Sequence, residues 1–346
     1  RWTGVPVGLS AHIDAFRQVG RLQRLSWAMA CAALWVALEM IQARLFTGFP
    51  WNLLGASQAA MLPLIQIASL TGVYGVAFLI VWFSVSLLGT AAVMVRLPMR
   101  RESWMLELLL PLLGVAANVT FGMHQLRQPQ SPGHKVKLAL VQPSIPQTVI
   151  WDSAAAEERF RQVIRLSEQA LTSVQPDLLV WPEAAVPSFA RWDTNIYQAI
   201  TNLVRQHAAW LILGSDDVAL AKPPRHERDV VYFNSAFLVR PDGEFVADYR
   251  KRRLVAFGEY VPLERWLPFL KYLTPVSAGF TPGTRPVTFH LPDLGIKLSV
   301  LICFEDIFPH LAREYVDPET DFLLNLTNNG WFGESAAQWQ HAASAV

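Results

Sequence analysis

The chain has 346 residues, of which 52% are hydrophobic and only 16% are charged, whereas an ordinary soluble domain carries about 25% charged residues. This composition is typical of a protein that is partly embedded in a membrane. The formal net charge is +1, and lysine and arginine form no dense stripe along the sequence. A nucleic-acid partner is therefore excluded from the expected functions.

Three apolar segments are long enough, at about 1.5 Å per residue, to cross a hydrocarbon core about 30 Å thick. They cover residues 26–43, 70–95 and 103–123. Residues 45–69 are also apolar, but glycine and proline interrupt them, which favours an interfacial or re-entrant loop over the alternative of a fourth span. We therefore predict a transmembrane region over residues 1–133.

Basic residues indicate how these spans are oriented. Three arginines, the last of them Arg24, precede the first span, and three more lie between the second and third spans. Such clusters remain cytoplasmic, so the chain after about Arg127 should be extracytoplasmic. Inside the first span, Glu39 should contact either a lipid head group or the loop that follows, unless it pairs with Arg44.

Residues 134–346 alternate short β-rich runs with helical patterns, which predicts an α/β domain. A turn at Pro241-Asp242-Gly243 should join two strands into a hairpin that ends at Lys251. The remaining expected elements are, in chain order, a strand at 136–142, a helix at about 153–174, a strand at 177–181, a helix at about 194–206, a strand at 209–216, and three later strands in the runs VTFHLP, KLSVLICFED and DFLLNLTNN.

Cys303 is one of only two cysteines, and the other, Cys31, lies in an expected membrane span. A disulfide between them is geometrically unfavourable, so Cys303 should be a free thiol. A packed core thiol is the plain alternative. Taken alone, Glu183 after a strand could equally be a solvated loop acid, and Lys251 between two arginines could equally be a surface charge.

Together, Glu183, Lys251 and Cys303 supply what an acyl-transfer site needs. A carboxylate can accept the proton of a thiol whose reference pKa is about 8.5, and an ammonium can stabilise both the thiolate and the oxyanion on the attacked carbonyl. The eight histidines and two cysteines form no HxxxH or CxxC arrangement. The sequence therefore predicts no metal site and no cofactor.

The ordered triplet in VWPEAAVP, DYRKRRL and LICFED resembles the nitrilase superfamily, whose catalytic triad is Glu-Lys-Cys. With the membrane spans, the stretches LFTGFPWNLLGASQ, VQPSIPQTVIWD, KRRLVAFGEYVPLE and LTNNGWFGESAAQWQH resemble the bacterial apolipoprotein N-acyltransferase family. The resemblance covers most of residues 26–346. It implies a nitrilase-like α-β-β-α sandwich preceded by transmembrane helices. It also implies a fragment at both ends, with the catalytic domain at 134–346 incomplete at its C-terminus.

Carried onto matching positions, the resemblance implies specific roles. Glu183 would be the general base, Lys251 the cation that stabilises the oxyanion, and Cys303 the nucleophile that becomes a thioester. Glu259 and Glu305 would be supporting acids of the active site, although Glu305 could instead hold a neighbouring backbone group.

Four aromatic residues complete the expected site. Phe304 stands where the family more often has tyrosine, which keeps an aromatic wall without the hydroxyl. Trp331 and Phe332 would form a substrate loop, unless they serve only in packing. Trp266 belongs to a Pro-rich loop at about 257–286, which is either a lid or membrane-dipping arm or a segment packed against the sandwich.

The resemblance also implies the reaction and the partners. The protein would transfer a fatty acyl chain from a membrane phospholipid, phosphatidylethanolamine above all, to the α-amine of the diacylglyceryl-cysteine of apolipoproteins. We expect a monomer in the bacterial inner membrane, multi-pass, with its catalytic domain on the periplasmic face. The alternatives are a membrane-anchored amidase that hydrolyses a C–N bond and a non-catalytic protein that binds lipid or lipoprotein.

Overall fold

The computed structural model describes residues 20–94, 104–128, 133, 135–145, 153–221, 230–264, 266–274 and 279–346. The chain divides into two compact units: Arg1–Ser131 with Trp339–Val346, and Pro132–Gln338.

The first unit contains three helices that are long and apolar enough to cross a membrane. They are α2 (Arg21–Gln42), α5 (Val73–Met94) and α6 (Met105–Arg127), and α5 packs against both of the others. Helix α2 therefore begins before the expected segment 26–43, and α6 continues beyond the end of the expected segment 103–123. The segment between α2 and α5 forms only short turns instead of a fourth span: η1 (Leu45–Thr47), η2 (Leu54–Gln58), α3 (Leu62–Ile65) and α4 (Ala68–Thr71).

Three charged side chains in the described part of this unit are buried, and each has a defined partner. The Arg24 guanidinium lies 2.5 Å from Glu107 of α6, so this arginine near the start of α2 is packed between the two helices. The Glu39 carboxylate accepts hydrogen bonds from Trp35 Nε1 (3.0 Å) and from the backbone N–H of Leu54 (2.7 Å). The predicted contact with the following loop is thus the one formed. The other basic residues of both clusters, except Arg21, lie outside the described residues.

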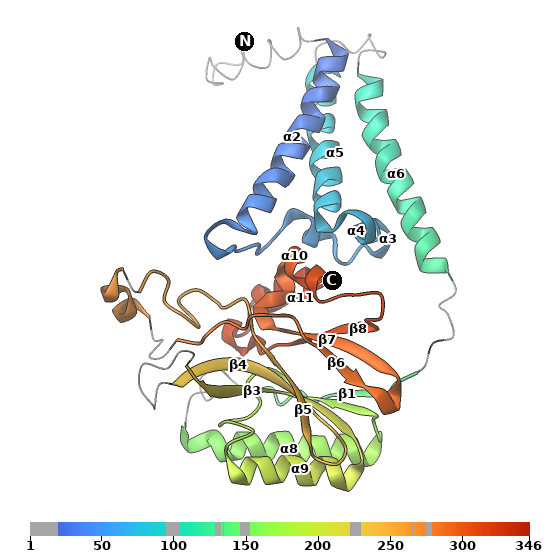
Figure 1. Ribbon diagram of the computed structural model, residues 1–346. Coiled ribbons are helices and arrows are strands. Elements are labelled where there is room, and N and C mark those ends of the chain that lie inside the picture. Colours follow the sequence, from blue (N-terminus) through green and yellow to red (C-terminus); the bar gives the residue numbers. More distant parts are fainter. Residues whose placement is uncertain are drawn as a thin grey trace. The chain divides into compact units, whose positions relative to one another are not determined.

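The second unit contains two β-sheets, shown in Figure 1. The five-stranded sheet follows chain order, with the first three strands parallel and the last three antiparallel: β1 (Leu138–Leu140), β2 (Leu178–Val180), β3 (Trp210–Leu220), β4 (Val230–Val239) and β5 (Phe245–Arg250). The three-stranded sheet pairs β7 antiparallel with β6 and parallel with β8: β6 (Thr288–Leu291), β7 (Ile296–Ile302) and β8 (Phe322–Leu326).

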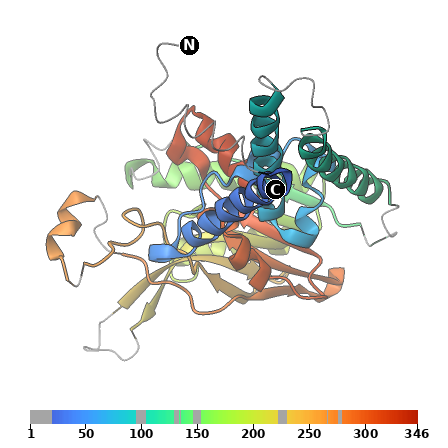
Figure 2. The same cartoon turned by 90° about the horizontal axis from the view of Figure 1, so that it is seen from above.

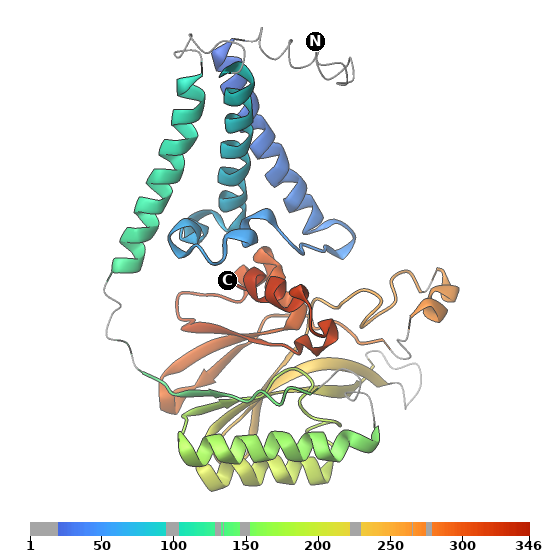
Figure 3. The same cartoon turned by 180° about the vertical axis from the view of Figure 1, so that it is seen from behind.

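Alternation along the strands explains how the layers stack. On β3, Leu211 and Leu213 belong to the core formed with α8 (Ala156–Ser173) and α9 (Thr194–His207). The buried Ile212 between them points to the opposite face, over which the three-stranded sheet lies (Figure 3). A short helix, α10 (Pro309–Glu314), follows on the outer side of that second sheet. The predicted α-β-β-α sandwich is confirmed.

Turn and helix signals in the sequence predicted the segments that connect and follow the strands. Gly243 takes φ +87° in the turn between β4 and β5, as a glycine can and most residues cannot. The helix expected at 153–174 begins with a 3₁₀ turn, η4 (Ser153–Ala155), before α8. After β8 the chain forms η8 (Asn329–Phe332) and α11 (Ala336–Ser344), so the C-terminal helix ends two residues before the last residue.

The middle of the Pro-rich loop projects away from the sandwich (Figures 1 and 2), whereas its two ends stay on it, where Glu259 bonds Lys251 and the Thr281 N–H donates to the carbonyl of Tyr232 on β4. Its short helix η5 spans Pro268–Leu273. Trp266 and Tyr272 are each 79% exposed, and Phe269 is 57% exposed. The alternative in which these aromatic residues pack against the sandwich is therefore wrong, and an exposed apolar arm remains.

Candidate active site

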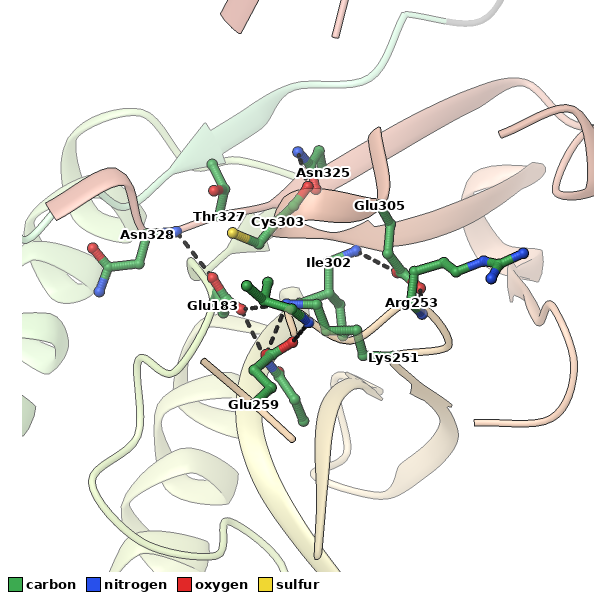
Figure 4. A network of polar contacts seen from close by, with 12 residues as sticks. Glu183, Lys251, Arg253, Glu259, Ile302, Cys303, Glu305, Asn325, Thr327 and Asn328 are labelled. Carbon is green, nitrogen blue, oxygen red and sulfur yellow. Dashed lines mark hydrogen bonds and ion pairs between the residues drawn. The ribbon is translucent and has the colours of Figure 1, made fainter. Parts of the chain in front are cut away.

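Three strand ends from the two sheets bring the predicted triplet together. Glu183 lies in the loop after β2, Lys251 directly follows β5, and Cys303 directly follows β7. Figure 4 shows the three side chains pointing toward one another. Only 7% of Glu183 and 1% of Lys251 are exposed. The arrangement joins a buried carboxylate and a buried ammonium to a half-buried thiol.

Lys251 lies between two carboxylates. Its Nζ is 3.2 Å from Glu183 Oε1 and 2.8 Å from Glu259 Oε1. Burial opposes the ammonium form, but the negative charges of Glu183 and Glu259 outweigh it, so the pKa of Lys251 is raised. Lys251 is therefore a permanent cation that can stabilise a developing oxyanion.

Asn234, in the middle of β4, is a site residue that the sequence analysis missed. Its Nδ2 donates to Glu183 Oε1 (2.8 Å) and to Glu259 Oε1 (3.0 Å), so one amide group holds both carboxylates. Its backbone carbonyl accepts from the N–H of Lys251 (2.8 Å). The signal in the sequence that could have identified Asn234 is its polar side chain within the apolar strand run YFNSAFLV.

Backbone donors fix the remaining carboxylate oxygens. The Val255 N–H donates to Glu259 Oε2 at 2.8 Å, and the Asn328 N–H donates to Glu183 Oε2 at 3.3 Å. Both carboxylates are therefore oriented from two sides before any substrate arrives. Such preorganisation lowers the reorganisation needed during the reaction.

Cys303 has a backbone conformation that is rare for a residue with a side chain. Its φ is +51° at the start of η7 (Cys303–Ile307). The side chain of Asn325 holds this turn, since it donates to the carbonyl of Cys303 (3.2 Å) and to the carboxylate of Asp306. The turn directs Sγ toward Glu183 and Thr327 (Figure 4).

The electrostatic surroundings keep Cys303 protonated at rest. Burial, and then the negative charge of Glu183, raise the pKa of Cys303 to about 12, against the opposing effects of Lys251 and the Thr327 hydroxyl. A thiol with this pKa needs a base at the moment of attack. Glu183 shares a hydrogen bond with the thiol and can accept its proton.

We expect Cys303 to react slowly with iodoacetamide at pH 7, because the thiolate is the reactive form and is scarce there. The rate at Cys303, followed by mass spectrometry of its peptide, should still be rising at pH 10, whereas a free cysteine peptide reaches its plateau near pH 9 to 10, above a reference pKa of about 8.5. A plateau below pH 8 would contradict the protonated resting state.

Glu305 is fully buried and faces the backbone instead of the triplet. Its carboxylate accepts from the N–H groups of Ile302 (2.9 Å), Arg252 (2.7 Å) and Arg253 (3.0 Å), and from the Tyr249 hydroxyl at 2.7 Å. Burial raises its pKa, although these hydrogen bonds oppose the shift. Glu305 therefore fastens the segment that follows Lys251 to the residue that precedes Cys303.

The predicted aromatic residues occupy different environments. Phe304 is buried and packs edge to face on Phe308, with ring centroids 5.0 Å apart. Trp331 is 54% exposed and Phe332 is half-buried, both in η8, which follows the Asn328 N–H that binds Glu183. The exposed Trp266 belongs to the projecting arm. Their roles toward a substrate stay predictions.

Within the described ranges, no group of three or more histidine, cysteine, aspartate or glutamate side chains could hold a metal ion. The chemistry that this arrangement can perform is acyl transfer through a cysteine thioester, since it joins a nucleophile, a base and an oxyanion-stabilising cation.

Comparison with known proteins identifies relatives in both units. Residues 137–346 match the model of the carbon-nitrogen hydrolase family, and residues 4–86 match the model of the apolipoprotein N-acyltransferase N-terminal domain. Apolipoprotein N-acyltransferase of Geobacter metallireducens is 38% identical over 335 residues, 94% of this chain and 61% of the relative. That of Bradyrhizobium diazoefficiens is 33% identical, over 98% of this chain and 64% of the relative.

Among solved structures, an amidase from Nesterenkonia sp. aligns with 58% of this chain and 67% of its own, at 20% identity and a TM-score of 0.39.

The chain spans less than two thirds of the length of the first two curated relatives. The predicted resemblance is confirmed over nearly the whole chain. The family model covers more than half of the residues, including all three of the triplet, and the chain belongs to the carbon-nitrogen hydrolase family.

Proposed function

We propose that this protein transfers a fatty acyl chain from a membrane phospholipid to the N-terminal α-amine of a diacylglyceryl-modified apolipoprotein. The observation that carries the proposal is the triplet, in which Glu183 contacts both the Cys303 thiol and the Lys251 ammonium. Apolar helices in the same chain, and relatives named for this activity, support a lipid-bound substrate instead of a soluble one.

The first half-reaction forms the acyl-enzyme. Glu183 accepts the proton of Cys303 as Sγ attacks the ester carbonyl of the phospholipid, and the Lys251 ammonium stabilises the oxyanion. As the carbonyl re-forms, the ester C–O bond breaks. The departing alkoxide takes the proton from Glu183 and leaves as a lysophospholipid. Phosphatidylethanolamine is the proposed donor.

The second half-reaction transfers the acyl chain to the amine. The neutral α-amine attacks the thioester carbonyl, Glu183 accepts a proton from the nitrogen, and the C–S bond breaks. The released sulfur of Cys303 recovers the proton from Glu183, and an amide is the product. Both substrates stay in the bilayer, since each buried CH₂ contributes about 0.8 kcal/mol to membrane binding.

The proposal includes the setting of the protein. The protein is a multi-pass component of the bacterial inner membrane, and its α/β unit works on the periplasmic face, as the arginines around the start of the first span and between the second and third spans favour. Glu183, Lys251 and Cys303 all come from one chain, so a monomer has a complete site.

Intact-mass spectrometry of the full-length protein in phospholipid micelles tests this function. We expect one acyl adduct, which hydroxylamine removes and Cys303→Ala prevents. A diacylglyceryl-cysteine peptide should discharge the adduct and yield an N-acyl peptide. Discharge by water alone, with no N-acyl product, would instead identify an amidase-like hydrolase. A folded protein that forms no adduct would contradict the lipid-donor chemistry and leave binding without turnover.

A further inference from the structure

A third carboxyl group lies beside the two glutamates of the active site. Asp216 of β3 is the cross-strand partner of Asn234 on β4, and the backbone of Asn234 in turn pairs with Lys251. Cross-strand partners project to the same face of a sheet, with Cβ atoms about 4.5–5.5 Å apart. Asp216, Asn234 and Lys251 therefore form one row across β3, β4 and the residue that follows β5, on the face that carries the site.

The amide of Asn234 has a defined orientation, because its Nδ2 donates to both Glu183 and Glu259. The Oδ1 atom must then point away from the glutamates. In the part of the chain that the structure describes, this oxygen is buried and no hydrogen-bond donor reaches it. A buried acceptor without a donor costs about 1–3 kcal/mol, so a donor is expected at this position.

Asp216 can supply that donor only when it is protonated. The charged groups that act on it are Glu183 from the loop after β2 and Glu259 from the segment after β5. Its neighbour Asp217 points to the other face of the sheet, where it binds Arg191 and Arg250. Burial first, and then the charges of Glu183 and Glu259, raise the pKa of Asp216 to about 6.

We propose that Asp216, as a neutral carboxylic acid, donates a hydrogen bond to Asn234 Oδ1 and so fixes the amide that holds Glu183 and Glu259. Asp216 is thus a positioning residue that acts through Asn234. Its importance for turnover rests on the proposed function, whereas its effect on the resting thiol does not.

Ionisation of Asp216 reverses this arrangement. A carboxylate beside Oδ1 places two acceptors together, which favours rotation of the Asn234 amide until Nδ2 faces Asp216. The glutamates then lose their shared donor and meet Oδ1 instead. Glu183 is no longer held against the Cys303 thiol, so above the pKa of Asp216 this thiol reacts more slowly than in a protein whose residue 216 stays neutral.

Reaction of Cys303 with dipyridyl disulfide measures this effect without any lipid substrate. All variants carry Cys31→Ser, so that the released thiopyridone reports Cys303 alone. Asp216→Asn keeps an N–H donor for Oδ1 at every pH and should match the parent protein within about twofold at pH 5. At pH 8 the parent should react about tenfold more slowly than Asp216→Asn, a modest loss for a displaced catalytic group.

Asp216→Ala has no donor and should react about tenfold more slowly than the parent at pH 5. Asp248→Asn is the matched control, because this β5 aspartate is paired with Arg191 and its substitution should leave both rates unchanged.

A constant ratio of the rate of the parent to that of Asp216→Asn between pH 5 and pH 8 would overturn the proposal. Equal losses in Asp216→Asn and Asp216→Ala at pH 5 would also overturn it, by showing that the charge is required. Absence of an acyl adduct on the parent would reject only the proposed function.

Discussion

Replacing Lys251 with methionine is expected to lower both the stability and the turnover of the protein. The side chain is buried between Glu183 and Glu259, so methionine of similar length leaves two carboxylates facing one amide without a cation. Removing one partner of a buried ion pair costs about 3–5 kcal/mol. Loss of the cation that stabilises the oxyanion should slow acylation of Cys303 by about 10²–10³-fold.

Chemical denaturation of the α/β unit within the intact protein measures the stability change, and adduct formation by mass spectrometry measures the rate. Lys297→Met is the matched control, since Lys297 pairs with Glu319 at the surface and contributes about 0–1 kcal/mol. Adding Glu259→Gln to Lys251→Met should restore part of the stability, because one uncompensated charge is removed. A Lys251→Met protein that unfolds at the same denaturant concentration as the parent would show that the buried pair has no net effect.

The sequence predicted most of the sandwich because its strands carry a clear local signature. Runs such as AWLILGSD and KLSVLICFED are apolar, bounded by turn residues and spaced for α/β alternation, and each became a strand. The order of the strands and the division into two sheets depend on pairing between distant residues. Those features came from the family resemblance, since no local pattern specifies them.

The triplet was predictable because each member directly follows, or lies close after, a recognisable strand. Asn234 was not, because a polar residue inside an apolar strand run has no distinctive spacing. The pairing of Arg24 with Glu107 spans 83 positions and depends on how α2 packs against α6. The burial of Arg24 near the start of α2 could therefore not be predicted from its neighbours in the sequence, because it requires the carboxylate that a second helix provides.

Glu305 supports the site through hydrogen bonds to the backbone. The family resemblance implied a supporting acid of the active site, with a hold on neighbouring backbone as the other role, and its carboxylate binds three backbone N–H groups and one hydroxyl. It therefore fixes the relative position of two backbone segments, because it joins the residues after Lys251 to the residue before Cys303. A residue of this kind can be indispensable without contacting any reacting atom.

We expect Glu305→Leu to destabilise the α/β unit by about 4 kcal/mol or more, because several buried donors lose their acceptor at about 1–3 kcal/mol each. Tyr249→Phe removes only one of these hydrogen bonds and should cost about 1 kcal/mol. Glu314→Gln is the control, since Glu314 is an exposed partner of Arg252 and should change stability by less than about 0.5 kcal/mol.

The pH dependence of the free energy of unfolding of Glu305→Leu tests whether ionisation of Glu305 affects stability. Burial raises the pKa of Glu305 above its ordinary value of 4.5, so the folded protein binds this proton more tightly than the unfolded chain does. The free energy of unfolding should therefore fall as the pH rises from about 4.5 through the raised pKa. Glu305→Leu lacks this group, and thermal unfolding in detergent should show a smaller decline over that range. An identical decline in the variant would assign the pH dependence to other acids, and would leave Glu305 as a hydrogen-bonding acceptor whose ionisation does not affect folding.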